Sequence, residues 1–176
     1  MTKTRIRLAR PEDLPLLPDI ERAASRLFVE AGIGGVVSVM PVAKLEAARA
    51  EGGLLLAVDG RDVPVGFAVV RATQAGAHLC EMNVHPKHGR QGIGTALLQA
   101  SLAKAAGPMT LTTYREVPWN APFYAGQGFV VVPPEAWSAE MAALAAAEGV
   151  VPGSGRVLMR HEAAVIRGNV VFAPMR

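Results

Sequence analysis

Apolar and polar residues alternate along the first half of the chain in a way that predicts several strands. Residues 5–10 (RIRLAR) alternate strictly, which is typical of a strand with one buried face. Residues 54–60, 63–73 and 77–86 are rich in valine, leucine and alanine, and the first two segments are joined by a short Asp-Gly-Arg-Asp turn. Neighbouring strands with short connections indicate an antiparallel meander.

Other segments repeat their apolar residues with the spacing of a helix. Pro15 and Pro18 favour a helix that becomes regular only after Pro18, since proline is poorly tolerated inside a helix. Residues 40–53 predict a second, short helix that stops at two glycines. Residues 92–107 predict a third helix, whose buried stripe consists of Ile93, Ala96, Leu97, Ala100 and Ala103.

The C-terminal part of the chain completes an alternating order of elements. We expect strands at 109–114, 128–132 and 156–164, with helices around 123–127 and at 136–149. The full order of strands and helices predicts an α+β fold with a single mixed, mostly antiparallel sheet flanked by helices. At its centre a strand leads through a glycine-rich loop into a helix.

Composition and length narrow the class of protein. With 176 residues, of which 51% are hydrophobic and 19% charged, the chain suits one globular domain, which we place at residues 1–163 with a tail at 164–176. The net charge of +3 is spread along the chain and aromatic residues make up only 5%, which argues against a nucleic-acid partner and favours a small polyanionic ligand. We expect no membrane span and no leader, because there is no long apolar run and no apolar segment at the N-terminus. A single cysteine, Cys80, indicates a cytoplasmic protein, and the histidine spacing predicts no metal site.

The glycine-rich loop is the strongest candidate for a binding site. Residues 85–98 read HPKHGRQGIGTALL, and a glycine-rich turn that feeds a helix exposes several N–H groups that attract phosphate. The residues whose N–H groups could serve are Arg90, Gln91, Gly92, Ile93, Gly94 and Thr95. The spacing of an ATP-binding P-loop fails because Thr95-Ala96 stands where Lys-Ser/Thr is needed, and the dinucleotide fingerprint fails because its third glycine is Leu97. A plain glycine-rich turn without a ligand remains the alternative.

Two segments together resemble motifs of the GNAT superfamily of N-acetyltransferases. MNVHPKHGRQGIGTALL resembles the acetyl-CoA-binding motif of that family, with Val84, Pro86, Gly92 and Gly94 at matching positions. The leading Arg/Gln of the motif is Gly89 in this chain, and Arg90 comes one place later. NAPFYAGQGF resembles the downstream Asn…Tyr-x-x-x-Gly-Phe segment of the family. The resemblance implies a GNAT-like sheet with a splayed central strand pair and acetyl-CoA as the co-substrate.

The resemblance also implies roles for individual residues. Free backbone groups of Met82, Asn83 and Val84 would pair with the pantetheine arm. Tyr124 would be the general acid that protonates the leaving thiolate, with a core tyrosine that packs against the sheet as the alternative. For the general base, strand alternation places Leu79, Glu81, Asn83 and His85 on one face, and we select Glu81, with Glu116 as the second choice. Asn120 is carried as a cofactor contact or as the cap of the following helix, and Trp119 as an acceptor-pocket residue or, in preference, a core residue.

Three functions stay open for such a chain. The leading hypothesis is acetylation of a small-molecule primary amine by direct attack in a ternary complex. The alternatives are acetylation of a protein N-terminus or lysine, and a non-catalytic CoA-binding module. We expect residues 32–40 and 137–155 to line the acceptor side, and the apolar tail could contribute to a homodimer.

Overall fold

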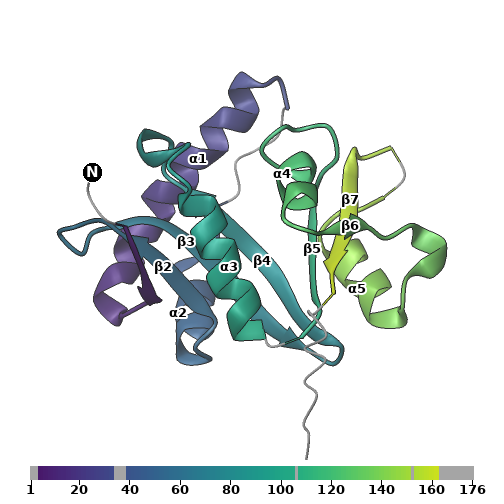
Figure 1. The fold of residues 1–176 in the computed structure, drawn as a ribbon, viewed down its shortest axis with the longest axis horizontal. Coiled ribbons are helices and arrows are strands. Elements are labelled where there is room, and N and C mark those ends of the chain that lie inside the picture. Colours follow the sequence, from purple (N-terminus) through teal and green to yellow (C-terminus); the bar gives the residue numbers. More distant parts are fainter. Residues whose placement is uncertain (1–3, 34–38, 106, 152, 163–176) are drawn as a thin grey trace, which may run out of the picture.

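One mixed sheet runs through the whole molecule (Figure 1). The computed structural model describes residues 4–33, 39–105, 107–151 and 153–162. Within these residues the strand order is β1-β2-β3-β4-β5-β7-β6. All neighbouring pairs are antiparallel except β4 and β5, which are parallel. The strands are β1 (Arg5–Leu8), β2 (Leu54–Val58), β3 (Pro64–Thr73), β4 (Gly76–Val84), β5 (Met109–Tyr114), β6 (Val130–Val131) and β7 (Arg156–His161).

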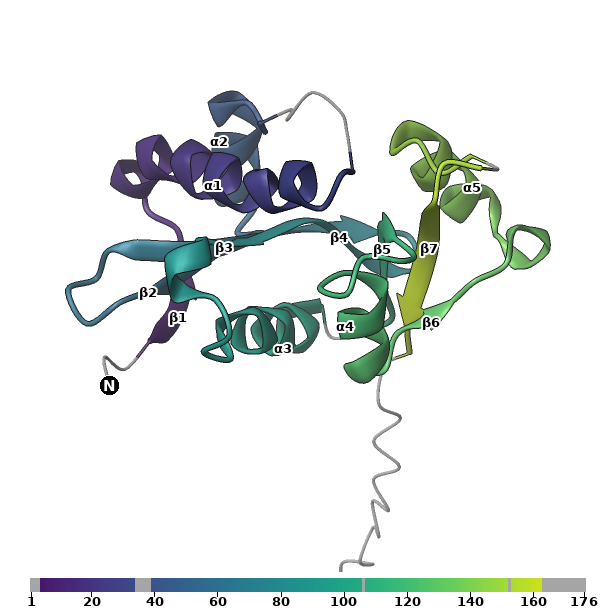
Figure 2. The ribbon, with the colours of Figure 1, turned by 90° about the horizontal axis from the view of Figure 1, so that it is seen from above.

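Helices cover both faces of the sheet (Figure 2). α1 and α2 lie on one face, α3 and α4 lie on the other, and α5 lies beside β7 on the same side as α1. Each face has its own buried apolar cluster, because both faces of β2 and β3 are shielded from solvent. None of the described helices is long and apolar enough to cross a bilayer. The helices are α1 (Leu17–Glu30), α2 (Val42–Ala50), α3 (Ile93–Ala105), α4 (Ala121–Gly126) and α5 (Ala139–Ala147), with 3-10 turns at Pro11–Leu16, Pro86–His88 and Pro134–Ala136.

The predicted order of elements is confirmed, and the differences lie at element ends and in the buried stripe of α3, where Leu98 and Ser101 are buried whereas Ala96 and Ala103 are exposed. α1 begins at Leu17, two residues earlier than expected, because Pro18 occupies an early helical position where its missing N–H is not needed. α5 begins at Ala139, later than expected, because the Ser138 hydroxyl caps it by accepting the Met141 N–H at 3.2 Å. Residues 34–38 and 163–176, which include the predicted tail and part of the predicted acceptor loop, lie outside the described residues.

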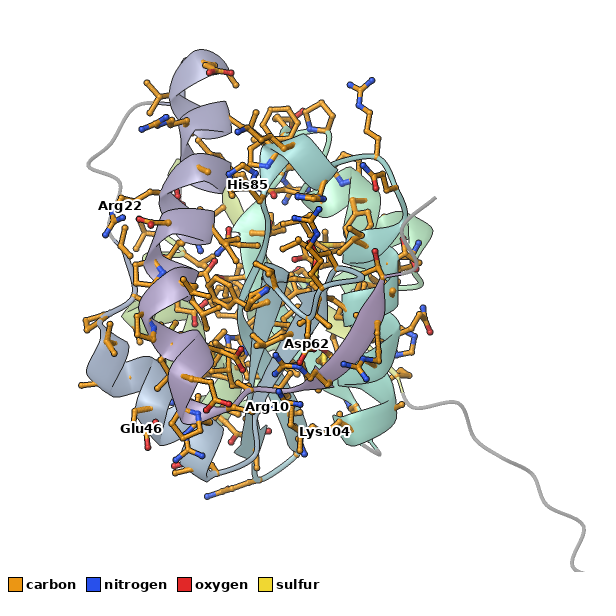
Figure 3. All side chains as sticks on the ribbon, turned by 90° about the vertical axis from the view of Figure 1, so that its left-hand side faces the viewer. Arg10, Arg22, Glu46, Asp62, His85 and Lys104 are labelled. Atoms are coloured by element: carbon orange, nitrogen blue, oxygen red, sulfur yellow. The ribbon has the colours of Figure 1, made fainter. Side chains whose placement is uncertain are left out.

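Arginines of the first strand are used inside the fold. Arg7 pairs with Asp13 at 2.7 Å and with Asp62 at 2.9 Å, and Arg10 pairs with Asp62 at 2.9 Å. Figure 3 shows Arg10 and Asp62 together at this end of the sheet. These contacts tie β1 to the following 3-10 turn and to the β2–β3 turn, so this part of the positive charge has a structural partner.

The central strand pair separates halfway along its length. β4 and β5 pair from Ala77↔Met109 to Leu79↔Leu111 and then diverge, which is the splayed central pair that we expected. On its other edge β4 carries a bulge at Cys80. Val70 opposes Leu79 and Val69 opposes Glu81, so Cys80 has no opposite residue in β3.

The bulge corrects one prediction from strand alternation. Leu79 joins the buried cluster under α3, whereas Glu81 lies opposite Val69, which belongs to the cluster under α1 and α2. Leu79 and Glu81 therefore face opposite sides of the sheet, and the predicted shared face was wrong for Leu79. The extra residue shifts the side-chain phase, so that Glu81 and Asn83 point toward α1.

Candidate active site

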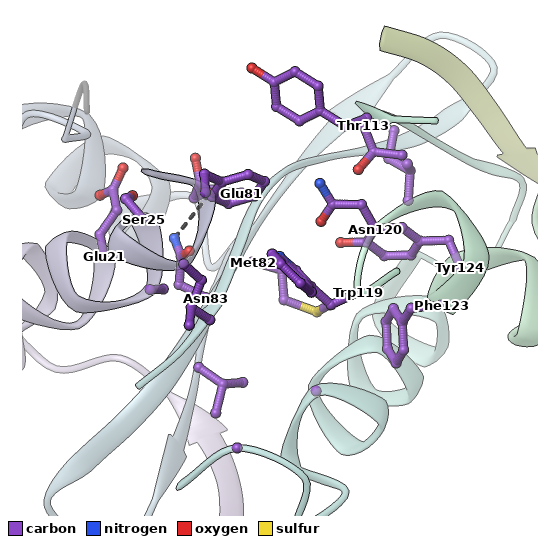
Figure 4. A pocket seen from close by; sticks show the side chains of 18 of the residues that line it. Glu21, Ser25, Glu81, Met82, Asn83, Thr113, Trp119, Asn120, Phe123 and Tyr124 are labelled. Carbon is purple, nitrogen blue, oxygen red and sulfur yellow. Dashed lines mark hydrogen bonds between the residues drawn. The ribbon is translucent and has the colours of Figure 1, made fainter. Parts of the chain in front are cut away.

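A cavity of about 980 Å³ occupies the place where β4 and β5 separate (Figure 4). Its walls come from α1, the divergent halves of β4 and β5, the glycine loop (residues 85–95), the segment 118–124, and two residues near the C-terminal end of the fold. Because the cavity opens between the two strands, side chains from both faces of the sheet reach it. The sequence-predicted residues that line it are Glu81, Met82, Asn83, Val84, Arg90, Gly92, Ile93, Gly94, Thr95, Asn120 and Tyr124; Gln91 is exposed and does not.

The glycine loop leaves its backbone donors unused. Arg90 and Gly92 have left-handed φ angles of 58° and 77°, and the first helical hydrogen bond of α3 runs from the Ala96 N–H to the Gly92 carbonyl. Among the described residues, none of the six N–H groups from Arg90 to Thr95 has a hydrogen-bond acceptor. A Cβ at Gly92 would meet no atom within 4 Å. The turn is therefore open, and its N–H groups lie at the N-terminus of α3, where an anion is stabilised.

The divergent half of β4 presents a free backbone edge to the cavity. Met82, Asn83 and Val84 pair with β3 on one side, and on the other side β5 has already turned away. The side chains of Met82 and Val84 pack against the cluster under α3. An extended strand edge of this kind can pair with an extended, amide-bearing ligand.

Glu81 is a carboxyl group whose ionisation is displaced toward neutral pH. Burial, together with the nearby carboxylate of Glu21, raises its pKa to about 7, while the amide Nδ2 of Asn83 donates to its Oε1 at 2.9 Å and acts in the opposite direction. Burial likewise raises the pKa of Glu21, whose two oxygens accept the Met40 N–H at 3.0 Å. A group with such a pKa can accept or release a proton under physiological conditions.

Tyr124 reaches the cavity from α4, on the other side of β4 from Glu81 (Figure 4). Its ring packs edge-on against Phe123 and Phe129, with centroids 5.1 and 5.7 Å away. Burial, together with the negative charge of Glu81, raises the pKa of the Tyr124 phenol well above its ordinary value. The phenol is therefore protonated at neutral pH and can donate its proton into the cavity.

The structure removes several alternatives. Asn120 precedes α4, but its side chain makes no capping hydrogen bond, so the expectation of a cap was wrong; it lies beside Tyr124 at the cavity (Figure 4). Trp119 is 42% exposed and lines the cavity, so the preference for a core position was also wrong. Glu116 and His85 do not line the cavity, and Glu116 is exposed.

Sequence reasoning missed the residues that line the cavity from distant parts of the chain. Of the described residues in the segment 137–155, only Glu148 reaches the cavity. Burial would raise its pKa, but hydrogen bonds with His78 at 3.0 Å and with Thr112 hold that pKa below its ordinary value. Phe28 of α1 stacks near both Tyr114 and Trp119, at centroid distances of 5.7 and 6.0 Å. No local pattern marks these residues, because tertiary structure alone brings them together.

Comparison with known proteins finds a similar domain in the central part of the chain. Residues 50–131 match the family described as the acetyltransferase (GNAT) domain, and this range contains β2 to β5, the glycine loop, α3 and α4. This part of the chain, just under half of it, is therefore similar to a GNAT acetyltransferase domain.

Individual proteins show the same similarity. Over 72 residues the chain is 46% identical to the mycothiol acetyltransferase of Clavibacter sepedonicus; the match covers 39% of this chain and 23% of that relative, so the chain spans about a quarter of it. The structure resembles the PaiA N-acetyltransferase of Thermoplasma acidophilum in complex with coenzyme A, with a TM-score of 0.67 and 20% identity over 91% of this chain and 99% of that one. It also resembles the N-acetyltransferase of a ribosomal-protein alanine from Escherichia coli, with a TM-score of 0.66 and 16% identity over 97% and 100% of the two chains. These structural likenesses concern the fold.

Proposed function

We propose that this chain transfers an acetyl group from acetyl-CoA to the primary amine of a small molecule, by direct attack in a ternary complex. The observation that carries the proposal is the row of six N–H groups from Arg90 to Thr95, which have no acceptor among the described residues and lie where β4 and β5 separate. Two similarities support coenzyme A as the anion: residues 50–131 match the GNAT acetyltransferase domain, and a structure with a similar fold contains coenzyme A.

The glycine loop and the free edge of β4 bind different parts of the cofactor. The N–H groups of Arg90, Gln91, Gly92, Ile93, Gly94 and Thr95 bind the pyrophosphate, with the Arg90 side chain adding positive charge. The free edge at Met82, Asn83 and Val84 pairs with the amides of the pantetheine arm and directs the thioester into the split. Asn120, beside Tyr124, contributes a polar contact to the cofactor near its reactive end.

Two side chains, those of Glu81 and Tyr124, accept and donate the protons of the reaction. Glu81 accepts a proton from the acceptor's ammonium group, so that the neutral amine can attack the thioester carbonyl. Tyr124 donates its phenolic proton to the sulfur that leaves, and the second proton, which the nitrogen loses as the amide forms, restores the phenol. A backbone N–H of the divergent β4 polarises the carbonyl oxygen while negative charge develops on it.

The assay is release of CoA thiol by the purified chain with acetyl-CoA and a panel of amines. We expect release with at least one small primary amine and none with peptides. Release with peptides alone would support the protein-acceptor alternative, for which the cavity offers no specific feature. Binding of acetyl-CoA without transfer to any amine or peptide would identify a non-catalytic CoA-binding module.

Gly92→Ala is expected to weaken acetyl-CoA binding about tenfold, measured by calorimetry. The added Cβ would meet no protein atom, so the loss would come from the strained left-handed φ of 77° and from the methyl group in front of the anion. Gly52→Ala is the matched control, because Gly52 has a similar φ of 69° after α2 and lies outside the cavity. Both variants should lose about 1 kcal/mol of stability, and equal acetyl-CoA affinity in both would contradict the role of the loop.

A further inference from the structure

Arg156 is a half-buried cation on the acceptor side of the cavity with few partners of its own. It is the first residue of β7, pairs with Tyr114 of β5, and lines the cavity. Its guanidinium carbon lies 4.9 Å from the centroid of the Tyr114 ring, and Nη2 donates to the Thr112 hydroxyl at 2.8 Å. A guanidinium carries five N–H donors. This hydrogen bond is the only one its guanidinium makes to the described residues, and Nε is buried without an acceptor.

Arg156 also makes no salt bridge in the described part of the chain. The other described arginines that are not fully exposed, Arg7, Arg49 and Arg160, each pair with a carboxylate within 3.0 Å. The nearest acid in the Arg156 network is Glu148, and the Arg156 charge contributes to lowering its pKa, but the Thr112 hydroxyl lies between the two groups and both Glu148 oxygens are already engaged. A partly buried charge without a direct carboxylate contact is costly, so the position favours an anion from outside the chain.

The geometry of the sheet puts Arg156 and Glu81 on the same face. Arg156 is two residues before Leu158, which packs under α5, and Glu81 lies opposite Val69 in the cluster under α1. α1 and α5 lie on the same side of the sheet (Figure 2). The two side chains therefore line the acceptor side from opposite walls of the split, β4 on one side and β7 beside β5 on the other.

We propose that Arg156 binds a carboxylate of the acceptor, so that the substrate is a small amino acid whose amine faces Glu81 and whose carboxylate faces the guanidinium. This inference rests on the proposed acetyl transfer. The planar guanidinium matches a carboxylate with two parallel hydrogen bonds. A diamine or polyamine would instead place an ammonium group against Arg156, which is unfavourable although Glu21, Glu81 and Glu148 also line the cavity.

The test compares matched acceptors with the full chain, by CoA thiol release: the standard amino acids, their methyl esters, the corresponding decarboxylated amines, aminophosphonate analogues and linear polyamines. We expect kcat/KM for the preferred amino acid to exceed that for its ester by about 10- to 100-fold, the range of one charge-assisted hydrogen bond. Arg156→Gln should remove this preference by lowering kcat/KM for the acid and leaving that for the ester unchanged. Arg156→Lys should retain part of it, and Arg115→Gln, an exposed neighbour outside the cavity, should retain all of it.

The outcomes separate this inference from the acetyl transfer itself. Equal turnover of acids and esters, or a preference for polyamines, would overturn the role of Arg156 while the transferase stands. A preference for phosphonates over carboxylates would overturn the amino-acid assignment. No CoA release with any acceptor would contradict the proposed function and this inference with it. Acetyl-CoA affinity and the melting temperature check that the variants fold, and if Arg156→Gln unfolds, Arg156→Lys and the acid-to-ester ratio of the unmodified protein decide.

Discussion

Tyr124→Phe lowers kcat about 100-fold and leaves the Kd for acetyl-CoA within about twofold: this is the result we expect. A positioned general acid contributes about 100- to 10,000-fold to a proton-transfer step, and we expect the lower end because water in the open cavity can replace part of it. The phenylalanine ring keeps the packing against Phe123 and Phe129, so only the hydroxyl is lost. The measurement is steady-state turnover with the preferred amine, together with acetyl-CoA binding by calorimetry.

Tyr114→Phe is the matched control for this prediction. Tyr114 also lines the cavity, but it stacks on Phe28 and under Arg156 at the acceptor side. Loss of its hydroxyl should change kcat by less than about threefold, since no described proton step involves it. Unchanged turnover in Tyr124→Phe would show that the sulfur leaves without this acid.

Glu81→Gln is expected to lower kcat/KM about 100-fold or more at neutral pH and to change its pH dependence. In the unmodified protein the rate should fall as the pH drops through about 7, because protonation of Glu81 removes the base. In the variant this limb of the pH profile should disappear. Glutamine keeps the oxygen that accepts from Asn83, so the local geometry has its closest neutral substitute.

The same substitution has a predictable effect on stability. Burial and the Glu21 carboxylate raise the pKa of Glu81 in the folded state, so the folded chain holds this proton more tightly than the unfolded chain. The stability this contributes is present at low pH and is lost as the pH rises through about 7. Glu81→Gln should therefore raise the melting temperature in alkaline buffer while activity falls. Glu116→Gln, at an exposed position outside the cavity, is the control and should change neither the activity nor the melting temperature. A Glu81→Gln variant with full activity and an unchanged pH profile would exclude Glu81 as the base.

The sequence was sufficient for those features that are encoded locally. The glycine loop could be recognised because left-handed turns and close backbone approach need glycine, and Gly92 has the φ angle that this argument requires. The order of strands and helices followed from apolar periodicity, which local side-chain burial determines. Element ends were less predictable, as Ser138 shows: its cap displaces the start of α5 past Trp137, whose indole N–H instead donates to the Val132 carbonyl at 2.8 Å.

The acceptor side could not be predicted, because it depends on pairing between distant segments. The bulge at Cys80 moves the side chains that follow it to the opposite face of β4, and no residue in the segment HLCEMNV indicates a bulge. Glu148 follows α5 and Arg156 begins β7, and neither position carries a recognisable motif. They meet at Thr112 only because β7 pairs with β5 and α5 packs on β7. Glu21 likewise reaches Glu81 only through the packing of α1 on the sheet.

The most direct measurement of the central claim is an amide NMR titration of the isotope-labelled full chain with acetyl-CoA. The account predicts that the amide resonances of Gly92, Gly94 and Thr95 and of Met82 to Val84 shift together and saturate. Pantetheine alone should shift only the strand resonances. ATP or NAD that shifts and saturates the same loop resonances, while acetyl-CoA leaves them unmoved, would contradict the account.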